Sequence, residues 1–596
     1  MVLSTLQRAG SDNMKLFLCA LSVAIMAPLA AADPLDELIP AYEAHVKSAS
    51  PEAAAGDLDE SPHQWSDVSP QAVSDYAEEA RALLEKVQNA KTDRVIDQAI
   101  LERLLQSELM EADYDTARIP FTGDWGFQAQ PIFAAMRETI TTVQEGQAWI
   151  DRLNDTDRYF EQNIANMRRG IETGWTANAD PLGTVMEQIR EQIVEDPAES
   201  GLYAPFLSLP DDMSEADKTR LQADGLDAVS HAIEAYRETL DFLESEYAPE
   251  ARDGAGIADL PGGRDAYAAA VEHYTAGAGY DAEMIHALGN EEVQRIRAKM
   301  EAIIAEIGYQ GSFDEFLTYL RTDPQFYAET PEQLMAAAEE VSARLRAILP
   351  DYFGHLPELD FNVEPVPASI APGYTTGRYV SGDPKAGRKG TYLVNTYALD
   401  QRPLYELPSL SAHEAVPGHH LQITLAQEMT DQPEFRKDYY ATAFGEGWGL
   451  YSERIAGEAG IYRTPYERFG ALSYEMWRAC RLVADTGLHW YGWSREEAEA
   501  CFVENSALSP LNIKTEVTRY IGWPGQAVAY KVGELKIREL RAYAEETLGP
   551  KFDIRDFHDV VLGEGAVPLD VLDWRIKTWV DSQMVAEETV PEAPQD

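Results

Sequence analysis

Apolar residues recur at spacings of three and four along most of this chain, with charged residues between them, which is the pattern of amphipathic helices. The pattern is clearest in three segments: SDYAEEARALLEKVQ (74–88), DRVIDQAILERLLQSEL (93–109) and MEQIREQIVEDP (186–197). Helical patterns of this kind dominate the sequence. They predict a mainly α-helical protein.

Capping sequences mark two helix starts. Thr330 precedes Pro331, a residue suited to the first position of a helix, and Gln333 completes a capping box. Ser494 and Glu497 form a second capping box ahead of the segment AEACF. The sequence therefore predicts helices that begin directly after Thr330 and Ser494.

Two segments interrupt the helical pattern. In 360–399, Val, Tyr and Thr alternate between turn clusters, which predicts a small β-sheet. The segment 251–265 is rich in glycine and has no periodicity, so we expect a loop there. This loop divides the mature chain into an N-terminal helical half (33–250) and a C-terminal half (251–584), followed by an acidic tail (585–596).

The composition is that of a globular protein, with 45% hydrophobic and 25% charged residues among 596. The charge is strongly acidic, since 49 Lys and Arg stand against 102 Asp and Glu. Binding to nucleic acid or to anionic lipid needs a positive surface, so a net charge of −53 disfavours both. The acidity is explained by a solvated surface that favours solubility.

The N-terminus has the features of an export signal. Lys15 is followed by the apolar run LFLCALSVAIMAPLA and by an Ala-x-Ala site that ends at Ala32. The run has 15 residues, fewer than the about 20 that a membrane-spanning helix needs. We therefore predict a signal peptide over 1–32 and a periplasmic or secreted protein with no integral membrane span.

Cysteine use is sparse, because only Cys19, Cys480 and Cys501 occur. Cys19 lies inside the hydrophobic run of the signal peptide rather than after it, so we expect no lipoprotein site there. Removal of the signal peptide leaves Cys480 and Cys501. These two residues can form one disulfide or remain as buried thiols, and the sequence does not decide between the two.

Three of the eleven histidines fall within the segment HEAVPGHH, at His413, His419 and His420, and Glu414 follows the first of them. Zinc peptidases need two neutral imidazoles on the metal and a carboxylate that takes a proton from the attacking water. The usual HExxH spacing places both histidines on one helical face. Here the position four after His413 is Pro417, so a regular helix would not bring two of these histidines to one metal ion.

The helix is not expected to be regular at this point. Pro417 has no N–H for the carbonyl of His413, and Gly418 permits a positive φ. A looped-out insertion of two residues would bring His419 to the usual second position, whereas His420 requires an excursion of three. We therefore predict His413 and His419 as ligands, with His420 as the alternative ligand.

A second motif, FGEGWGLYSE, follows about 30 residues later and carries Glu446 and Glu453. In zinc peptidases of the two-histidine, one-glutamate class, the third ligand is a carboxylate. Residues seven apart project from one face of a helix. We predict Glu446 as the third ligand and Glu453 as the hydrogen-bond partner of a ligating histidine. Gly445 and Gly447 are expected to let the backbone pack tightly against the histidine helix.

The C-terminal run RYIGWPGQAVAYKVG contains Arg519, Tyr520 and Tyr530. A phenol or a guanidinium group near the metal stabilises the oxyanion of a tetrahedral intermediate, so we predict this role for Tyr530, with Tyr520 or Arg519 nearby. Ordinary aromatic packing is the alternative for each residue.

A further row, Arg481, Asp485 and His489, is spaced four apart on one helical face. Such a row either orients a substrate or forms an internal ladder of ion pairs. We favour the ladder.

The motifs HEAVPGHHLQ, FGEGWGLYSE and RYIGWPGQAVAYKVG occur in this order and together resemble the domain-of-unknown-function 885 family, a large bacterial group described as zinc carboxypeptidase-like. The likeness extends over most of the mature chain and includes LPGGRDAY near residue 260 and IHALGNEEVQRI near residue 285. The resemblance implies an α+β fold, mainly helical with a small β-sheet. It is expected to be a zincin-like metallopeptidase fold of the gluzincin type, with two helical halves around a deep cleft.

Carried over residue by residue, the resemblance implies that His413 and either His419 or His420 hold one zinc ion per chain, that Glu446 completes the site and that Glu414 is the general base. We therefore expect a zinc-dependent hydrolase that cleaves peptide bonds of oligopeptides, as an exopeptidase or an oligopeptidase.

The predicted strand GTYLVNT, with Tyr392 and Asn395, is expected to pair with an extended peptide substrate. Two alternatives remain open. One is a zinc amidohydrolase that acts on non-peptide amides or amino-acid conjugates. The other is an inactive periplasmic binding or scaffold protein, against which the presence of Glu414 argues. The sequence does not predict the oligomeric state.

Overall fold

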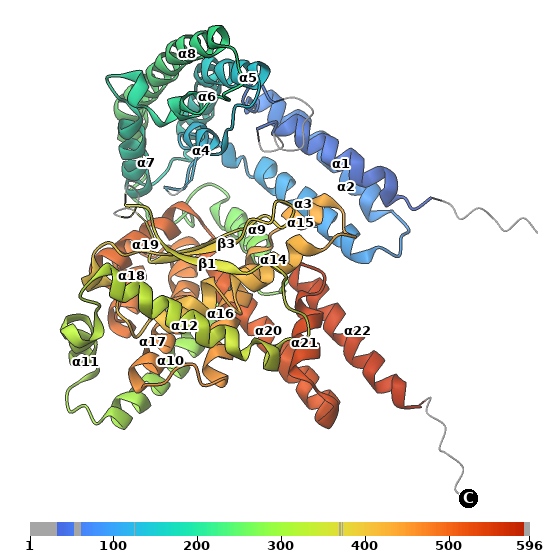
Figure 1. The fold of residues 1–596 in the computed structure, drawn as a ribbon, viewed down its shortest axis with the longest axis vertical. Helices are drawn as coiled ribbons and strands as arrows, with labels where there is room; N and C mark the ends of the chain where they lie inside the picture. Colours follow the sequence, from blue (N-terminus) through green and yellow to red (C-terminus); the bar gives the residue numbers. More distant parts are fainter. Residues whose placement is uncertain (1–31, 53–60, 124, 369–370, 372–373, 589–596) are drawn as a thin grey trace, which may run out of the picture.

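The computed structural model describes residues 32–52, 61–123, 125–368, 371 and 374–588. Its described part is mainly helical, with a small three-stranded sheet (Figure 1), as the periodicity predicts. The predicted signal peptide and its cleavage site lie outside the described residues.

The α-helices are α1 Leu35–Ala49, α2 Pro70–Gln88, α3 Val95–Asp113, α4 Gln130–Arg137, α5 Val143–Asn154, α6 Thr156–Thr173, α7 Ala179–Gln192, α8 Glu215–Phe242, α9 Gly263–Thr275, α10 Ala282–Ile307, α11 Phe313–Thr322, α12 Pro331–Tyr352, α13 Leu407–Glu414, α14 His419–Glu428, α15 Glu434–Asp438, α16 Thr442–Glu458, α17 Pro465–Thr486, α18 Arg495–Asn505, α19 Pro510–Gly522, α20 Ala529–Leu548, α21 Ile554–Leu562 and α22 Leu569–Glu588. Short 3-10 helices are η2 Thr116–Arg118, η3 Pro197–Glu199, η4 Gly201–Leu207, η6 Ala248–Glu250, η7 Pro324–Phe326, η9 Leu399–Gln401, η11 Gln526–Val528 and η12 Gly549–Lys551. Single π-helical turns, η5 Leu243–Tyr247 and η10 Gly487–Tyr491, extend α8 and α17.

The capping sequences place the helix starts correctly. Helix α12 begins at Pro331, and the side chain of Thr330 accepts a hydrogen bond from the N–H of Gln333. The side chain of Gln333 accepts from the N–H of Glu329 rather than of Thr330, so the predicted capping box is only half formed. Helix α18 begins after Ser494 with both bonds of the box present.

Two predicted boundaries are shifted. Helix α7 ends at Gln192, because the chain from 193 onward turns into short 3-10 segments. Helix α22 runs to Glu588, beyond the predicted start of the acidic tail at 585.

The sheet comprises β1 Phe361–Pro365, β2 Gly377–Val380 and β3 Gly390–Val394, within the predicted segment 360–399. Strand β3 lies in the centre, parallel to β1 and antiparallel to β2. Figure 1 shows the strands crossing the middle of the molecule. Both edges of β3 are therefore already hydrogen-bonded, and the outer edges of the sheet belong to β1 and β2.

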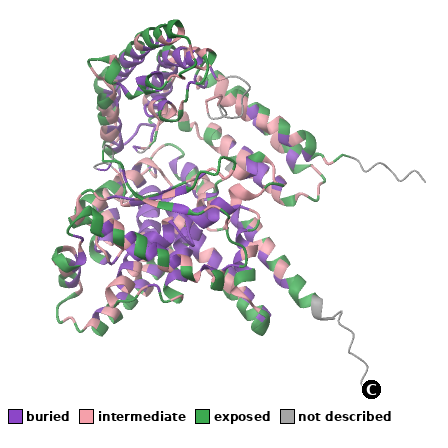
Figure 2. Ribbon diagram, in the orientation of Figure 1, coloured by how far each residue is buried: buried purple, intermediate pink, exposed green. Residues whose placement is uncertain are grey.

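Helices α4 to α8 lie together at one end of the molecule (Figure 1) and bury a hydrophobic core of their own, which includes Trp149, Phe160 and Tyr236. The apolar side chains of α1 to α3 join a different core, shared with α9, α12, α16, α20 and α22. The division of the chain into halves at about residue 250 stays a prediction. Figure 2 shows the densest buried region in the body that contains α16, α17 and α20.

Helices α16 and α20 approach each other through glycines. A Cβ on Gly447 would lie 2.6 Å from the Cα of Gly533, and a Cβ on Gly533 would collide with the carbonyl oxygen of Ala443. The crossing thus requires residues without side chains on both helices. It fixes the position of α16, which carries Glu446 and Glu453.

We expect Gly533→Ala to lower the free energy of unfolding by about 1–3 kcal/mol, because the added methyl group forces the two backbones apart. Denaturant-induced unfolding followed by circular dichroism measures this change. The control is Gly183→Ala in α7, where a Cβ meets nothing within 4 Å. That variant should be neutral or more stable by up to about 1 kcal/mol, because alanine favours a helix. Equal stability of Gly533→Ala and the parent would contradict this description of the crossing.

Cys480 in α17 and Cys501 in α18 form a disulfide, which settles the question that the sequence leaves open. Cys480 is fully buried next to Arg481. Among the described residues, no helix combines the length and the apolar character that crossing a membrane requires.

Candidate metal centre

The helix that carries His413 is interrupted directly after Glu414. Helix α13 ends at Glu414 and α14 begins at His419, with Ala415, Val416, Pro417 and Gly418 between them. The N–H of His420 donates to the carbonyl of Ala415 at 3.1 Å, which restarts the helical bonding after the insertion.

Gly418 has a φ of −78°, so the predicted positive φ is wrong. The glycine is required for space instead, because a Cβ at this position would collide with the carbonyl oxygen of His413. The indole N–H of Trp448 in α16 donates to the carbonyl of Pro417 at 2.8 Å. This buried hydrogen bond holds the insertion against the helix that carries Glu446.

The structure brings His413, His419 and Glu446 together. The Nε2 atoms of His413 and His419 lie 3.4 and 3.6 Å from Oε2 of Glu446. The two imidazole rings are nearly perpendicular, with centroids 4.8 Å apart. Within the described part of the chain, this is the one group of three His, Cys, Asp or Glu side chains whose ligand atoms all lie within 4.8 Å of one another.

His420 points elsewhere. Its Nδ1 lies 3.0 Å from the hydroxyl of Tyr379 and 3.2 Å from that of Thr424, and its ring packs on Phe361. Burial lowers the pKa of His420 to about 4, so this histidine is neutral. Because its ring is committed to these neighbours, the geometry places His419 rather than His420 beside His413 and Glu446.

Glu453 lies on the same face of α16 as Glu446, about two turns further along. Its Oε1 is 2.9 Å from Nδ1 of His413. Its Oε2 accepts a hydrogen bond from the hydroxyl of Ser409 at 2.7 Å. The bonds fix the carboxylate and, through it, the ring orientation of His413. Gly449 makes room for this ring, since a Cβ there would lie 2.7 Å from the imidazole.

The predicted role of Gly445 and Gly447 is therefore wrong in detail. Gly447 faces α20 and Gly445 faces the ring of Tyr440, whereas Gly449 is the glycine that contacts the histidine.

His413 and Glu446 shift each other's pKa. Burial lowers the pKa of His413, but hydrogen bonds to Glu446 and Glu453 outweigh this effect and raise it to about 9. Burial raises the pKa of Glu446, yet the two histidines hold it well below its ordinary value. Glu446 is therefore ionised, and a proton on His413 balances part of the negative charge in the absence of another cation.

The donor set fits a zinc ion. Two imidazole nitrogens and one carboxylate oxygen are the three protein ligands of a catalytic zinc site, which keeps a further position open. Nε2 of His419 faces Glu446, whereas its Nδ1 is buried without a hydrogen-bond partner, unlike Nδ1 of His413, which bonds Glu453.

Glu414 lies at the end of α13, directly after His413. Its Oε2 accepts a hydrogen bond from the N–H of Tyr379 in β2 at 2.8 Å. The edge strand β2 thus orients this carboxylate.

Tyr440, which sequence analysis did not single out, also reaches the group. Its hydroxyl lies 3.4 Å from Oε1 of Glu446, while 44% of the residue is exposed. Desolvation of the hydroxyl, together with this carboxylate, raises the pKa of Tyr440 well above its ordinary value. Burial and the charge of Glu446 raise the pKa of Tyr530 as well. Both phenols stay protonated and can donate hydrogen bonds. Nothing in the sequence distinguishes Tyr440 from the other 28 of the 29 tyrosines.

Tyr520 is fully buried, and its hydroxyl donates to Glu516 and accepts from Arg481 and from Trp477. Arg519 donates to Glu516 and Gln526. Both residues thus hydrogen-bond Glu516, and their predicted role near the metal stays a prediction.

The predicted peptide-binding role of Tyr392 and Asn395 is wrong. Strand β3 has no open edge, and both side chains have exposed fractions of 0%. The amide of Asn395 donates to the carbonyls of Ala371, Tyr374 and Thr375, and the hydroxyl of Tyr392 lies 3.3 Å from that of Ser411. Both residues support the fold.

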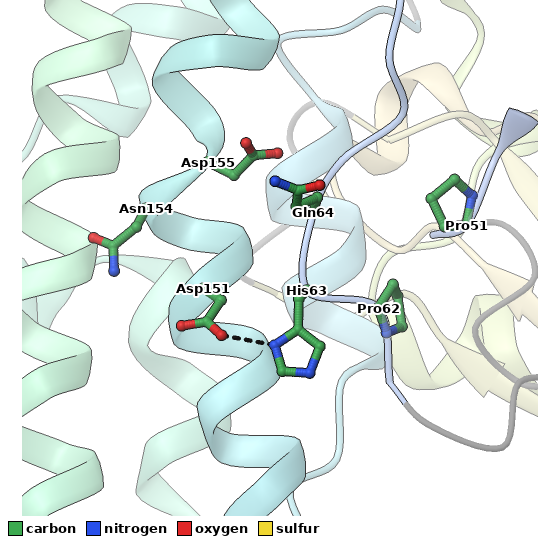
Figure 3. Close-up of a pocket in the computed structure, with 7 residues that line it drawn as sticks. All are labelled: Pro51, Pro62, His63, Gln64, Asp151, Asn154 and Asp155. Carbon is green, nitrogen blue, oxygen red and sulfur yellow. Dashed lines mark hydrogen bonds and ion pairs between the residues drawn. The ribbon is translucent and has the colours of Figure 1, made fainter. Parts of the chain in front are cut away.

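A cavity of about 620 Å³ lies at the surface of the N-terminal part (Figure 3). It is lined by Pro51, Pro62, His63, Gln64, Asp151, Asn154 and Asp155, and His63 bonds Asp151 at 2.6 Å. None of the predicted site residues lines it.

Residues 51–576 match the family described as "Bacterial protein of unknown function (DUF885)". A solved structure from Colwellia psychrerythraea, described as a "putative lipoprotein", is similar to this chain with a TM-score of 0.84 and 26% identity, covering 92% of this chain and 100% of the other. A second from Shewanella oneidensis, described as a "putative lipoprotein of unknown function", has a TM-score of 0.72 and 15% identity over 91% of this chain and 99% of the other, which shows the same fold. No curated protein matches the chain.

Proposed function

We propose that this chain, which belongs to the DUF885 family of bacterial proteins, is a zinc-dependent hydrolase that cleaves peptide bonds of oligopeptides. The observation that carries the proposal is the convergence of His413, His419 and Glu446. Glu414 follows His413 directly at the end of α13, and its charge helps to raise the pKa of His413. A binding or scaffold protein would not need the Glu414 carboxylate as a general base.

Each residue has a defined role in the proposal. His413, His419 and Glu446 hold the metal ion, which when bound acts as a Lewis acid and lowers the pKa of a water molecule. Glu414 accepts a proton from the attacking water and delivers it to the leaving amine. Tyr440 and Tyr530 donate hydrogen bonds to the developing oxyanion.

We further propose that a peptide lies along the outer edge of β2, which replaces the predicted pairing with β3. Strand β2 is an edge strand, and Tyr379 within it contacts the proposed base Glu414. Backbone pairing along this edge would place a peptide carbonyl next to Glu414.

We also propose that the protein acts outside the cytoplasm. The disulfide between Cys480 and Cys501 is typical of an oxidising compartment. The similar structure from Colwellia psychrerythraea is described as a lipoprotein, which fits an exported protein.

The first test is the metal content of the purified mature protein, together with its hydrolysis of a peptide library. We expect about one zinc ion per chain, loss of hydrolysis after treatment with a chelator, and recovery when zinc is returned. The amidohydrolase alternative predicts cleavage of acylated amino acids instead of peptides. Absence of bound zinc, even after zinc is supplied, would refute the proposal.

We expect Glu453→Gln to weaken zinc affinity by about 10- to 100-fold, because a neutral amide makes His413 a poorer ligand. Competition with a chromogenic chelator measures the dissociation constant. The control is Glu458→Gln on the same helix, whose carboxylate pairs with Arg454 and Arg541 instead. Equal affinity of the two variants would show that Glu453 does not assist the site.

A further inference from the structure

Two arginines share a single glutamate behind Tyr530. Arg481 of α17 and Arg519 of α19 both donate to Oε2 of Glu516, at 3.2 and 3.1 Å. The hydroxyl of Tyr520 donates to the same oxygen at 2.7 Å. Burial raises the pKa of Glu516, but the two arginines outweigh it and lower the pKa to about 2. The cationic cluster of Arg481, Arg519, Glu516 and Tyr520 therefore contains two positive charges and one negative charge.

The guanidinium group of Arg481 is incompletely satisfied. Only 4% of Arg481 is exposed, and its Nη1 is buried without a hydrogen-bond partner. Its Nε donates to Tyr520 and its Nη2 to Glu516. A buried donor without an acceptor is costly, and a charged donor more so. A carboxylate is the ligand that a guanidinium group binds best, because it accepts two parallel hydrogen bonds.

The cationic cluster adjoins Tyr530, the tyrosine that we propose to serve the oxyanion. The Cζ of Arg481 is 4.3 Å from the ring centroid of Tyr530, a tyrosine whose pKa the charge of Glu446 raises. Arg519 reaches Gln526, in the turn that leads to Tyr530, at 2.7 Å. Tyr530 therefore contacts Arg481 and also senses the charge of the proposed ligand Glu446.

One edge of the cluster borders solvent, because the side chains of Arg519 and Glu516 remain 13% and 16% exposed, whereas Arg481 is buried. The acidic surface repels anions, so this positive site would select for an anionic group only at short range.

We infer that Arg481 and Arg519 form a subsite that binds a carboxylate of the substrate. The inference rests on the proposed function and names its substrate class: peptides that present a carboxylate close to the scissile bond. Such a carboxylate is either the α-carboxylate at the end of a peptide or the side chain of an acidic residue. If the subsite binds the α-carboxylate, the enzyme is a peptidase that acts near the C-terminus of its substrate.

Binding to the zinc-loaded Glu414→Gln variant tests the subsite without turnover. Calorimetry compares acetyl-trialanine with its C-terminal amide, and with an amidated peptide that ends in glutamate. We expect the free acid to bind at least about tenfold more tightly than the amide, since one charge-assisted pair is lost in the amide. Tight binding of the glutamate amide as well would identify a general carboxylate site, and weak binding would restrict the subsite to the peptide terminus.

The same titrations on Arg481→Gln and Arg519→Gln, each combined with Glu414→Gln, assign the preference to the cluster. Either change should abolish the difference between acid and amide, mainly because the acid binds more weakly. Arg519 is less buried than Arg481, so its variant stays informative if the other misfolds. The matched control is Arg495→Gln in α18, which pairs with Asp180 and should keep the preference.

Two results would overturn the subsite. One is equal binding of acid and amide by the Glu414→Gln variant with both arginines intact. The other is a preference for the acid that survives when Arg519→Gln is added. The outcome for the hydrolase is separate, because zinc content and peptide cleavage are measured on the unmodified protein. An Arg519-dependent preference for acids without any cleavage would support the subsite and refute the hydrolase.

Discussion

Zinc binding should fall from about one ion per chain to nearly none when His413, His419 or Glu446 is replaced by alanine. Each change removes one of three protein ligands, and two ligands from separate helices do not retain the ion at micromolar concentration. Elemental analysis of the purified variants measures the loss. All three should also lose hydrolysis of any peptide that the parent protein cleaves.

His420→Ala is the matched control for this series. His420 is adjacent in sequence to His419 and is also buried, but it bonds Tyr379 and Thr424 instead of facing Glu446. The variant should keep its zinc. Circular dichroism confirms that each variant is folded before its metal content is compared. Loss of zinc in His420→Ala together with retention in His419→Ala would exchange the roles of the two histidines and refute the geometry.

Hydrolysis should fall by about 10²- to 10⁴-fold in Glu414→Gln, whereas zinc content should not change. The amide keeps the size of the carboxylate and can still accept the hydrogen bond from the N–H of Tyr379. It cannot take a proton from water at neutral pH. The values of kcat/KM and the zinc content of the same preparation separate the base from the ligands.

Glu428→Gln serves as the control for Glu414→Gln. The carboxylate of Glu428 also accepts backbone hydrogen bonds, from the N–H groups of Glu358 and Leu359, but it lies at the far end of α14. Its replacement should leave kcat/KM unchanged. Activity in Glu414→Gln close to that of the parent would show that another group acts as the base.

The helices could be predicted from the sequence because their signals are local. Periodicity places α2 and α3 within a few residues of their observed bounds, and the caps place the starts of α12 and α18. The preference for His419 over His420 also follows from local chemistry, since Pro417 forces a short insertion.

The strand order could not be predicted, because it depends on contacts between segments far apart in the chain. GTYLVNT is a good strand by composition, yet nothing in it reveals that β1 and β2 cover both of its edges. For the same reason the sequence assigned Asn395 and Tyr392 to substrate binding, although the fold buries them.

Distances between side chains on different helices could not be predicted from the sequence either. Arg519, Tyr520 and Tyr530 are close in sequence, but the packing of α19 against α17 binds the first two to Glu516 and leaves Tyr530 nearest to Glu446. Tyr440 reaches Glu446 only because Gly445 lets its ring lie against α16.

The bridge between Cys480 and Cys501 bears on how the protein should be produced for such assays. It joins α17 to α18 and begins at the residue before Arg481. Material made in the reducing cytoplasm of an expression host would lack this link, and Arg481 would then sit on a helix with one fewer constraint. Samples exported to an oxidising compartment, or refolded with a glutathione couple, are therefore the appropriate starting material for comparing substrate preferences.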